Sequence, residues 1–352
     1  MKKRRPVVML MVATMVFSFV MAGCSSKGTS SGMETDESSQ ETPGATDSAS
    51  KDSASSEDAS STAGGTNKVA FLINSSSDEY LLYMQKIFER DQADYGLEFV
   101  IFDAQGDSQT QAGQVSNAIA QGCEAIVINP NDAKGLGPAV KEAFEAGVHV
   151  ITTVGDIAEE YTQYRESFVG PDDHEAGQLA ADMMLEHFAD GGDIVIVEGM
   201  AGYDAQIKRH DAFFEAIEGS KLNVLDYQSL PAWDASDALA VTEDFIVKYG
   251  DKMQGLFCHW DYGMVGVIEA LDAAGITDDL YLVSIDGCKS GFQMVKDGKI
   301  NATIAQDVEA IALASMETLR TVLDGDTVDQ QVNPPLHVIT LENIDDYAWP
   351  EW

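Results

Sequence analysis

Polar and aromatic side chains follow several of the apolar runs in this chain, at the point where each run ends. Asp78 and Tyr80 follow residues 68–74, and Asp156 follows residues 149–152. Four more polar or aromatic residues follow apolar runs, namely Asn129, Trp260, Asp261 and Asp286. Carboxylate and amide groups exchange hydrogen bonds with hydroxyls, and aromatic faces pack on flat C–H surfaces. The sequence therefore predicts a cleft for a polar ligand.

The sequence lacks several motifs that mark catalysis or phosphate binding. It contains no HExxH zinc motif, no Walker loop and no GxGxxG fingerprint. Residues 135–138 include two glycines, but Pro138 lacks the N–H that a phosphate oxygen would need. We therefore expect no enzymatic activity, no cofactor and no metal. One alternative stays open, in which Asp261 and Asp286 form the acid and base of a glycoside hydrolase.

The elements that must position these residues alternate between short apolar runs and stretches of helical length. Apolar runs separated by helices are typical of a parallel sheet covered on both faces. Gly96, Gly122 and Gly147 stand where three helices should end, because glycine takes the left-handed conformation of a helix C-terminus. The predicted strands are 68–74, 97–103, 125–128, 149–152, 194–197, 222–227, 255–258, 280–285 and 302–305, and the predicted helices include 79–95, 108–121, 132–146, 175–188, 205–217 and 263–273.

This alternation occurs twice along the chain, in two stretches of similar size. The sequence thus predicts an α/β fold of two doubly wound parallel-sheet lobes. Ligands of such sheets bind beyond the carboxyl ends of the strands. With two lobes, the expected site is the cleft between them.

The net charge limits the classes of partner. The chain has 352 residues and a formal net charge of −38, which would repel nucleic acids and anionic lipid surfaces. Beyond Cys24, three cysteines remain, and their spacing is not that of a metal site or a disulfide framework. We expect Cys123, Cys258 and Cys288 to be free buried thiols, with a Cys258–Cys288 bridge as the alternative.

Five segments together resemble a known family. They are residues 125–132, 169–177, 199–202 together with Arg209, 284–287 and 297–306. On these motifs, residues 68–339 are similar to the periplasmic sugar-binding proteins of the ribose/galactose type, whose fold also occurs in the sensor halves of LacI-like repressors. The resemblance implies a type I periplasmic binding protein fold with a hinge. The implied lobes are an N-terminal one of 68–171 plus 307–335 and a C-terminal one of 172–306 plus 336–345.

The same resemblance implies roles for single residues. Tyr80 and Trp233 stand where the family places rings against the sugar. Arg209 matches an arginine that forks onto sugar oxygens, and Asp286 matches a hydroxyl-accepting aspartate. Gln306 ends the last strand before the chain crosses back, so it would serve both ligand and hinge. The complete predicted ligand-binding set is Asp78, Tyr80, Leu81, Asp156, Arg209, Trp233, Trp260, Asp261, Asp286 and Gln306.

Plainer interpretations of these residues stay open. Tyr80 and Trp233 could pack at a surface edge, and Arg209 could pair with Asp204 on the same helix. Asp286 could cap the helix that follows it.

Two departures from the family pattern bear on the ligand. Residues 154–156 read Val-Gly-Asp where the family often has Asp-Arg, and Trp260 replaces the usual Asn. The pocket would therefore lose an arginine and gain an indole. We expect a larger or less polar ring than ribose, such as a modified sugar or a cyclic polyol.

The first residues of the chain carry a targeting signal. Four basic residues precede a short apolar stretch that ends at Cys24, which is the order of a secretory signal. The Ala-Gly-Cys ending resembles a bacterial lipobox, so residues 1–24 are predicted to be a lipoprotein signal peptide with Cys24 lipidated. Residues 25–67 are rich in Ser, Thr and acidic side chains and are predicted to be a disordered tether. The globular part would then stand on the extracytoplasmic face of the cell membrane.

These observations lead to one functional prediction. The chain is expected to be a monomeric solute-binding lipoprotein that delivers a sugar or sugar-like polyol to an ABC transporter permease. One alternative is a sensor that presents the bound sugar to a membrane kinase or chemoreceptor, and another is the secreted glycoside hydrolase. Residues 345–352, with Trp349 and Trp352, extend beyond the family core, and we expect them only to pack on a lobe.

Overall fold

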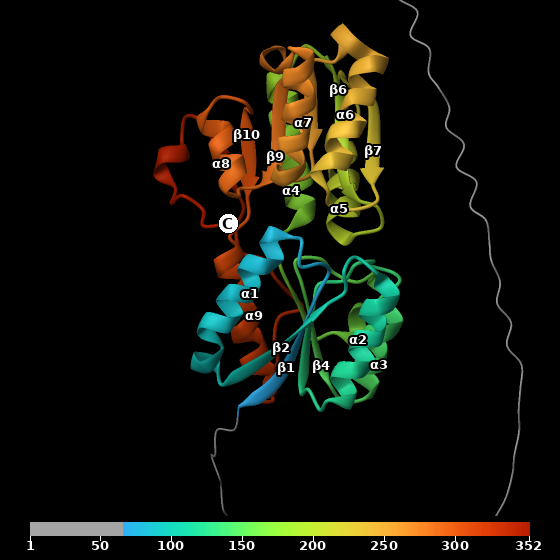
Figure 1. The fold of residues 1–352 in the computed structure, drawn as a ribbon, viewed down its shortest axis with the longest axis vertical. Coiled ribbons are helices and arrows are strands. Elements are labelled where there is room, and N and C mark those ends of the chain that lie inside the picture. Colours follow the sequence, from blue (N-terminus) through green and yellow to red (C-terminus); the bar gives the residue numbers. More distant parts are fainter. Residues whose placement is uncertain (1–65) are drawn as a thin grey trace, which may run out of the picture. The chain divides into compact units, whose positions relative to one another are not determined.

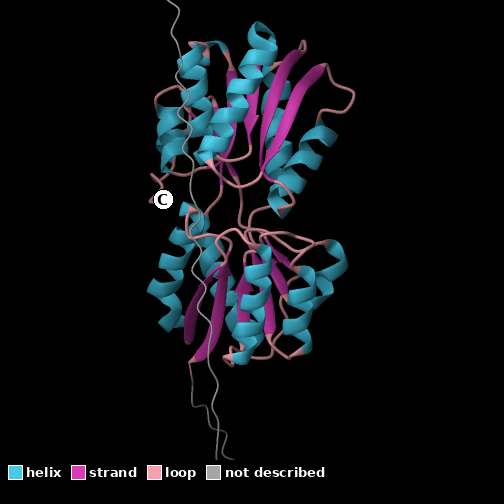
Figure 2. Cartoon of the chain, turned by 45° about the vertical axis from the view of Figure 1, so that its right-hand side comes forward, coloured by secondary structure: helices cyan, strands magenta, loops and turns pink. Residues whose placement is uncertain are grey.

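The computed structural model describes residues 66–352, which form two six-stranded sheets, each with helices on both faces (Figures 1 and 2). The predicted signal peptide, Cys24 and nearly all of the predicted tether lie outside these residues. None of the helices within 66–352 combines the length and apolar character that crossing a bilayer requires.

The first sheet is parallel throughout. Its strand order is β11-β5-β4-β3-β1-β2, with β1 paired on both sides, to β2 and to β3. A strand buried on both faces needs apolar residues at every position, and residues 69–73 of β1 are all buried. The strands are β1 (Asn67–Ile73), β2 (Leu97–Asp103), β3 (Ala125–Ile128), β4 (His149–Thr153), β5 (Ser167–Val169) and β11 (Gln331–Val332).

Helices cover both faces of this sheet. Phe71 and Ile73 pack in one core with α1 and α9, whereas Ala70 and Leu72 face the opposite core with α2 and α3. Alternate residues of one strand thus supply both cores. The helices are α1 (Glu79–Asp91), η1 (Gln92–Tyr95), α2 (Ser108–Ala120), α3 (Gly137–Glu145), η2 (Glu159–Tyr164) and α9 (Val308–Leu323).

The second sheet has the order β12-β10-β9-β8-β6-β7, and only β12 is antiparallel to its neighbour. Val195 and Val197 face a core with α6, α7 and α8, and Ile194 and Ile196 face a core with α4 and α5. The elements are β6 (Gly192–Met200), β7 (Leu222–Leu230), β8 (Gly255–Cys258), β9 (Tyr281–Asp286), β10 (Ala302–Ala305), β12 (His337–Thr340), α4 (Asp173–His187), α5 (Asp204–Ala216), α6 (Ala235–Tyr249), η3 (Gly250–Lys252), α7 (Asp261–Ala274), η4 (Thr277–Asp279), α8 (Lys289–Lys296) and η5 (Ile344–Asp346).

The predicted fold class is confirmed, and most differences concern element ends. The helix expected over 132–146 begins only at Gly137, because the side chain of Asp132 accepts the N–H of Gly135 and Pro138 stands in the first turn. Gly96, Gly122 and Gly147 all have positive φ, between 64° and 80°, as the predicted helix ends require. Sequence patterns did not predict β5, β11 and β12, of which β11 and β12 are edge strands; β5 and β11 have only three and two residues, which is too short for a clear apolar run.

The chain passes between the two sheets three times, after β5, after β10 and after β11. The lobe boundaries predicted at 171/172, 306/307 and 335/336 stay predictions.

Candidate functional site

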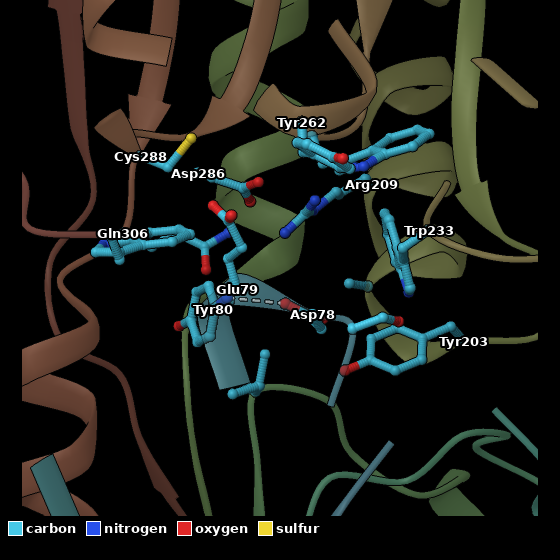
Figure 3. Close-up of a pocket in the computed structure, with 15 residues that line it drawn as sticks. Asp78, Glu79, Tyr80, Tyr203, Arg209, Trp233, Tyr262, Asp286, Cys288 and Gln306 are labelled. Carbon is cyan, nitrogen blue, oxygen red and sulfur yellow. Dashed lines mark hydrogen bonds between the residues drawn. The ribbon is translucent and has the colours of Figure 1, made fainter. Parts of the chain in front are cut away.

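A pocket lies where the strands of both sheets end. Its volume is about 80 Å³. Figure 3 shows Arg209, Asp286 and Gln306 directing polar groups into this space, with Tyr80 and Trp233 beside it. The lining residues are Ser77, Asp78, Glu79, Tyr80, Val154, Tyr203, Ala205, Arg209, Trp233, Trp260, Tyr262, Asp286, Cys288, Gln306 and Trp352.

Asp78 and Tyr80 reach the pocket because α1 begins there. Asp78 is the N-cap of α1, and its Oδ1 accepts the backbone N–H of Tyr80 at 2.9 Å (Figure 3). Burial raises the pKa of the Asp78 carboxyl to about 6, against the opposing effect of the Tyr80 and Leu81 N–H groups. Tyr80 is 7% exposed, and its hydroxyl has no hydrogen-bond partner among the described residues.

Arg209 is held by the second sheet's helices and is only 4% exposed. Its Nε lies 2.9 Å from Oδ1 of Asp173, and its Nη1 donates to the carbonyl oxygen of His259. The alternative pairing with Asp204 is not observed, because Asp204 instead binds Lys208 Nζ at 2.7 Å. The pKa of Arg209 is raised: Asp173 and Asp286 favour its charged form and outweigh the cost of burial.

Asp286 stands in a strained turn at the end of β9. Its φ is 129°, a value that L-residues rarely adopt, and Gly287 follows with φ 72°. Burial, together with the charge of Asp261, raises the pKa of the Asp286 carboxyl, and Arg209 opposes that shift. Val154, at the end of the first sheet's β4, is a second lining residue in the left-handed region, with φ 63°. Both strained residues face the pocket, where such strain tends to occur.

Asp286 does not cap the helix that follows it. The N-cap of α8 is Cys288, whose side chain makes no capping bond. The Oδ2 of Asp286 instead accepts the N–H of Asp261, the first residue of α7, at 3.2 Å.

Asp261 is not among the lining residues. It is fully buried and accepts the N–H groups of Gly287 and Cys288 at 2.8 and 3.0 Å, and Thr303 Oγ1 lies 2.8 Å from its Oδ1. These bonds fix the turn that presents Asp286 to the pocket. Burial raises the pKa of Asp261 to about 6. The pocket thus presents one of the two carboxylates that the hydrolase alternative requires.

Leu81 and Asp156 also lie away from the pocket wall. Leu81 is buried in the core beneath α1, because it is on the face of the helix that packs on the sheet. Asp156 forms a buried two-bond pair with Arg165, at 2.8 and 2.6 Å. The structure therefore brings seven predicted residues together, namely Asp78, Tyr80, Arg209, Trp233, Trp260, Asp286 and Gln306.

Aromatic rings make up much of the wall. Trp233 packs edge-on against Tyr203 and Trp260, with centroids 5.4 and 5.3 Å apart. Gly199 is required beneath it, because a Cβ there would lie 1.9 Å from the Trp233 ring. Tyr203 was not predicted, although its place at the N-cap of α5, next to the motif 199–202, is a signal that could have identified it.

The residues of the pocket wall also carry polar atoms without a protein partner. The hydroxyl of Tyr80, the Nε1 of Trp260 and both amide atoms of Gln306 are buried and unpaired within the described residues. A buried polar atom without a partner costs free energy, so such atoms at a pocket wall suit a ligand that both donates and accepts. Gln306 can do both, and the indole N–H can only donate.

Three hydrogen bonds connect the loops that follow β3 and β4 of the first sheet with the segment at the start of α5. Asn129 Nδ2 donates to the Tyr203 hydroxyl at 2.5 Å, and the Asp156 N–H donates to Asp204 Oδ2 at 2.9 Å. The N–H of Ala133 donates to the Gly202 carbonyl oxygen at 3.2 Å. These bonds hold the segment 202–204 against the first sheet's loops.

The remaining predictions about side chains concern thiols and metals. Cys123, Cys258 and Cys288 are free and buried, as predicted. Within residues 66–352, His, Cys, Asp and Glu form no group of three that could hold a metal ion.

Comparisons with known proteins agree with this architecture. A family model described as a periplasmic binding protein domain matches residues 69–327. The ribose import binding protein of Bacillus subtilis (strain 168) is 31% identical over 278 residues, which cover 78% of this chain and 88% of that protein.

Solved structures give the same result. An ABC transporter solute-binding protein from Bacillus halodurans C-125 with bound myo-inositol has a TM-score of 0.75 and 28% identity, covering 81% of this chain and 98% of its own. One from Agrobacterium vitis with bound D-fucose has a TM-score of 0.75 and 25% identity, covering 79% and 97%.

Proposed function

Because the chain belongs to the periplasmic binding protein domain family, we propose that it captures a sugar or cyclic polyol and delivers it to an ABC transporter. The relatives above are an import binding protein and transporter solute-binding proteins, which supports import over the sensor alternative. In this proposal the protein binds its ligand without chemical change, as a family of binding proteins would.

One observation carries the proposal: the pocket wall combines aromatic rings with buried polar atoms that have no partner among the described residues. Tyr80, Trp260 and Gln306 offer hydrogen-bonding atoms that the described residues do not use. A sugar ring has hydroxyls at its edge and C–H groups on its faces, so it matches both kinds of surface. Asp286 would accept from ligand hydroxyls, and Arg209 would donate to ligand oxygens.

The ligand would also bring the two lobes together. Ligand contacts from Tyr80 on one side and from Arg209 and Asp286 on the other would favour the state in which both sides are close. The bonds of Asn129 and Asp156 to Tyr203 and Asp204 would be formed in that state. The three crossings between the sheets would act as the hinge, and the closed form would dock on the permease.

We further propose that the protein is a lipoprotein anchored at Cys24 on the extracytoplasmic face. Mass spectrometry of the N-terminal peptide from the native host tests this directly. A peptide that begins at a diacylated Cys24 is expected, and an unmodified peptide that contains residues before Cys24 would contradict the anchor.

Isothermal titration calorimetry tests the ligand class. The probes are D-ribose, D-allose, D-fucose and myo-inositol, with glycine and L-leucine as controls. We expect one-to-one binding of at least one sugar or cyclic polyol and no heat from the amino acids. Absence of heat from every sugar and polyol of the panel would overturn the proposed function, whether or not an amino acid binds.

A further inference from the structure

Trp352 lines the pocket although it lies far along the chain from the other lining residues. The next lining residue back along the sequence is Gln306, at the end of β10. Between them the chain forms α9, β11 and β12, and then the segment 341–352, which we call the tail. The family model ends at residue 327, so the tail lies outside the part of the chain that it matches.

The tail is fixed to the second sheet through α8. The carbonyl oxygen of Trp352 accepts the N–H of Lys289, the first residue of α8, at 2.6 Å. Lys296, at the other end of that helix, binds Asp345 at 2.5 Å, and Trp349 packs edge-on against Phe292 with centroids 5.7 Å apart. These contacts run along one side of α8.

The side chain of Trp352 contacts the first sheet's helices. Its ring lies edge-on to Tyr80 of α1, with centroids 4.9 Å apart and planes at 73°. Figure 1 shows the C-terminal end of the chain beside α1. Tyr80 is itself a lining residue, and its hydroxyl is unpaired among the described residues. Trp352 thus links a backbone anchor on α8 to an aromatic contact on α1, across the wall of the pocket.

We propose that Trp352 is a ligand-contacting residue that the tail adds to the pocket and that it favours ring-shaped ligands over open-chain ones. This inference rests on the proposed function. The indole provides a flat apolar surface beside Tyr80 in the wall of the pocket. A ring with a C–H face covers such a surface, whereas a flexible polyol must lose conformational freedom to do so.

The alternative is that Trp352 only packs, as the rest of the tail does. Trp349 provides the matched control, because it belongs to the same segment, is 45% exposed and is not a lining residue. If packing were the whole role of the tail, Trp349→Ala and Trp352→Ala would have similar effects on binding.

The experiment is calorimetry on the purified protein and on Trp352→Ala, Trp352→Phe and Trp349→Ala, with the best cyclic probe of the panel above and with xylitol as an open-chain polyol. We expect Trp352→Ala to weaken binding of the cyclic probe about tenfold or more, as truncation of a central aromatic contact does. Trp352→Phe should retain most of the affinity, and Trp349→Ala, which loosens the tail on α8 but keeps the pocket-lining ring, should lower the affinity much less than Trp352→Ala does. The affinity for xylitol should change by less than about threefold in every variant.

Circular dichroism and the melting temperature check that each variant is folded, and Trp352→Leu, which keeps an apolar side chain without an aromatic ring, serves as the test if Trp352→Ala is not. In that case a cyclic-probe affinity lowered more in Trp352→Leu than in Trp349→Ala supports the inference, and equal affinities overturn it. Equal binding of the cyclic probe by Trp352→Ala and the unchanged protein overturns the inference and leaves the proposed function intact. If the unchanged protein binds none of the probes, the proposed function fails and the inference fails with it.

Discussion

The described pocket wall has three acidic side chains, Asp78, Glu79 and Asp286, and one basic side chain, Arg209. Arg209 is the one basic side chain among the described lining residues, and it is already paired with Asp173. Asp78 and Asp286 therefore have no cation of their own at the described wall, and burial raises the pKa of both. These carboxylates are costly in the unliganded protein, and a ligand whose hydroxyls donate to them would offset that cost.

Asp286→Asn should lower affinity and raise stability together. A hydrogen bond to a charged group contributes about 1.5–3 kcal/mol, so we expect the affinity for the sugar to fall roughly ten- to hundredfold. The melting temperature of the unliganded protein at pH 7.5 should rise, because burial raises the pKa of the Asp286 carboxyl, so folding must either bury its charge or protonate it, and the neutral amide removes that cost while its oxygen can still accept from Asp261. Calorimetry and thermal unfolding measure the two effects. Asp278→Asn, at an exposed site, is the control, and a loss of stability with unchanged affinity would contradict the assignment.

Asp78 should make stability depend on pH. Its pKa is about 6 in the folded protein and 3.8 in the reference state, so between these values the folded state holds the proton more tightly. The stabilisation is present below about pH 4 and is lost as the pH rises to 6. The free energy of unfolding should therefore be lower at pH 7.5 than at pH 5. Asp204 and Asp261, whose pKa values are also raised to about 6, act in the same direction.

Asp78→Asn isolates the contribution of one carboxyl, since Asn is an equally good N-cap and does not titrate. Urea unfolding at pH 5 and pH 7.5 should show a smaller pH difference in this variant than in the unchanged protein. An identical difference in both proteins would mean that Asp78 is already ionised in the folded state at pH 5.

Sequence patterns predicted the kinds of residue that line the pocket. They did not distinguish the carboxylates that face the pocket from those that lie behind its wall. Asp261 and Asp286 are both at or after strand ends and both acidic, so the pattern could not separate the lining carboxylate from the one that supports it. The difference depends on the positive φ of Asp286, which no composition rule reveals. No sequence pattern indicated that Trp352 lines the pocket, because its position depends on how the tail folds back onto α8.

Among the helices, the close packing of α4 on α5 positions Arg209. Gly177 of α4 lies against α5, and a Cβ there would be 2.5 Å from the carbonyl oxygen of Arg209 and 2.9 Å from its Cα. Because both atoms are backbone, α5 cannot stay in place if Gly177 carries a side chain. Most strands were predicted from their apolar runs, although β6 and β7 extend three residues beyond their predicted ends, whereas this contact between helices needed the structure.

Gly177→Ala should destabilise the protein by about 1–3 kcal/mol and weaken ligand binding, since α5 must move and carries Arg209 with it. Gly113→Ala is the matched control, because Gly113 is also inside a helix and a Cβ added there would meet no described atom within 4 Å. That substitution should stabilise by about 0.5–1 kcal/mol. Chemical denaturation measures both changes, and equal effects at the two glycines would contradict the close approach of α4 and α5.

Across the whole molecule, hydrogen bonds and ring contacts join the two halves of the pocket. Tyr203 contacts both halves, since its hydroxyl accepts a hydrogen bond from Asn129 and its ring packs on Trp233. The doubly wound lobes could be predicted from alternating runs and helices. The contacts between them could not, because they join loops that no periodic pattern describes.

Tyr203→Phe should weaken ligand binding about three- to tenfold, as loss of one neutral hydrogen bond does, while leaving the ring packing unchanged. Tyr227→Phe, which alters an exposed ring, is the control for loss of a tyrosine hydroxyl. Calorimetry with the best sugar probe measures the difference. Unchanged affinity in Tyr203→Phe would show that the bond to Asn129 does not support the ligand-bound state.

The central claim is that a small hydroxylated ring is held in this pocket and released unaltered. Native mass spectrometry of the protein incubated with an equimolar mixture of monosaccharides and cyclic polyols tests it most directly. We expect one added mass per chain, equal to that of a compound in the mixture, and recovery of that compound unchanged after unfolding. A spectrum that shows only the bare protein, or a recovered compound of altered mass, would contradict it.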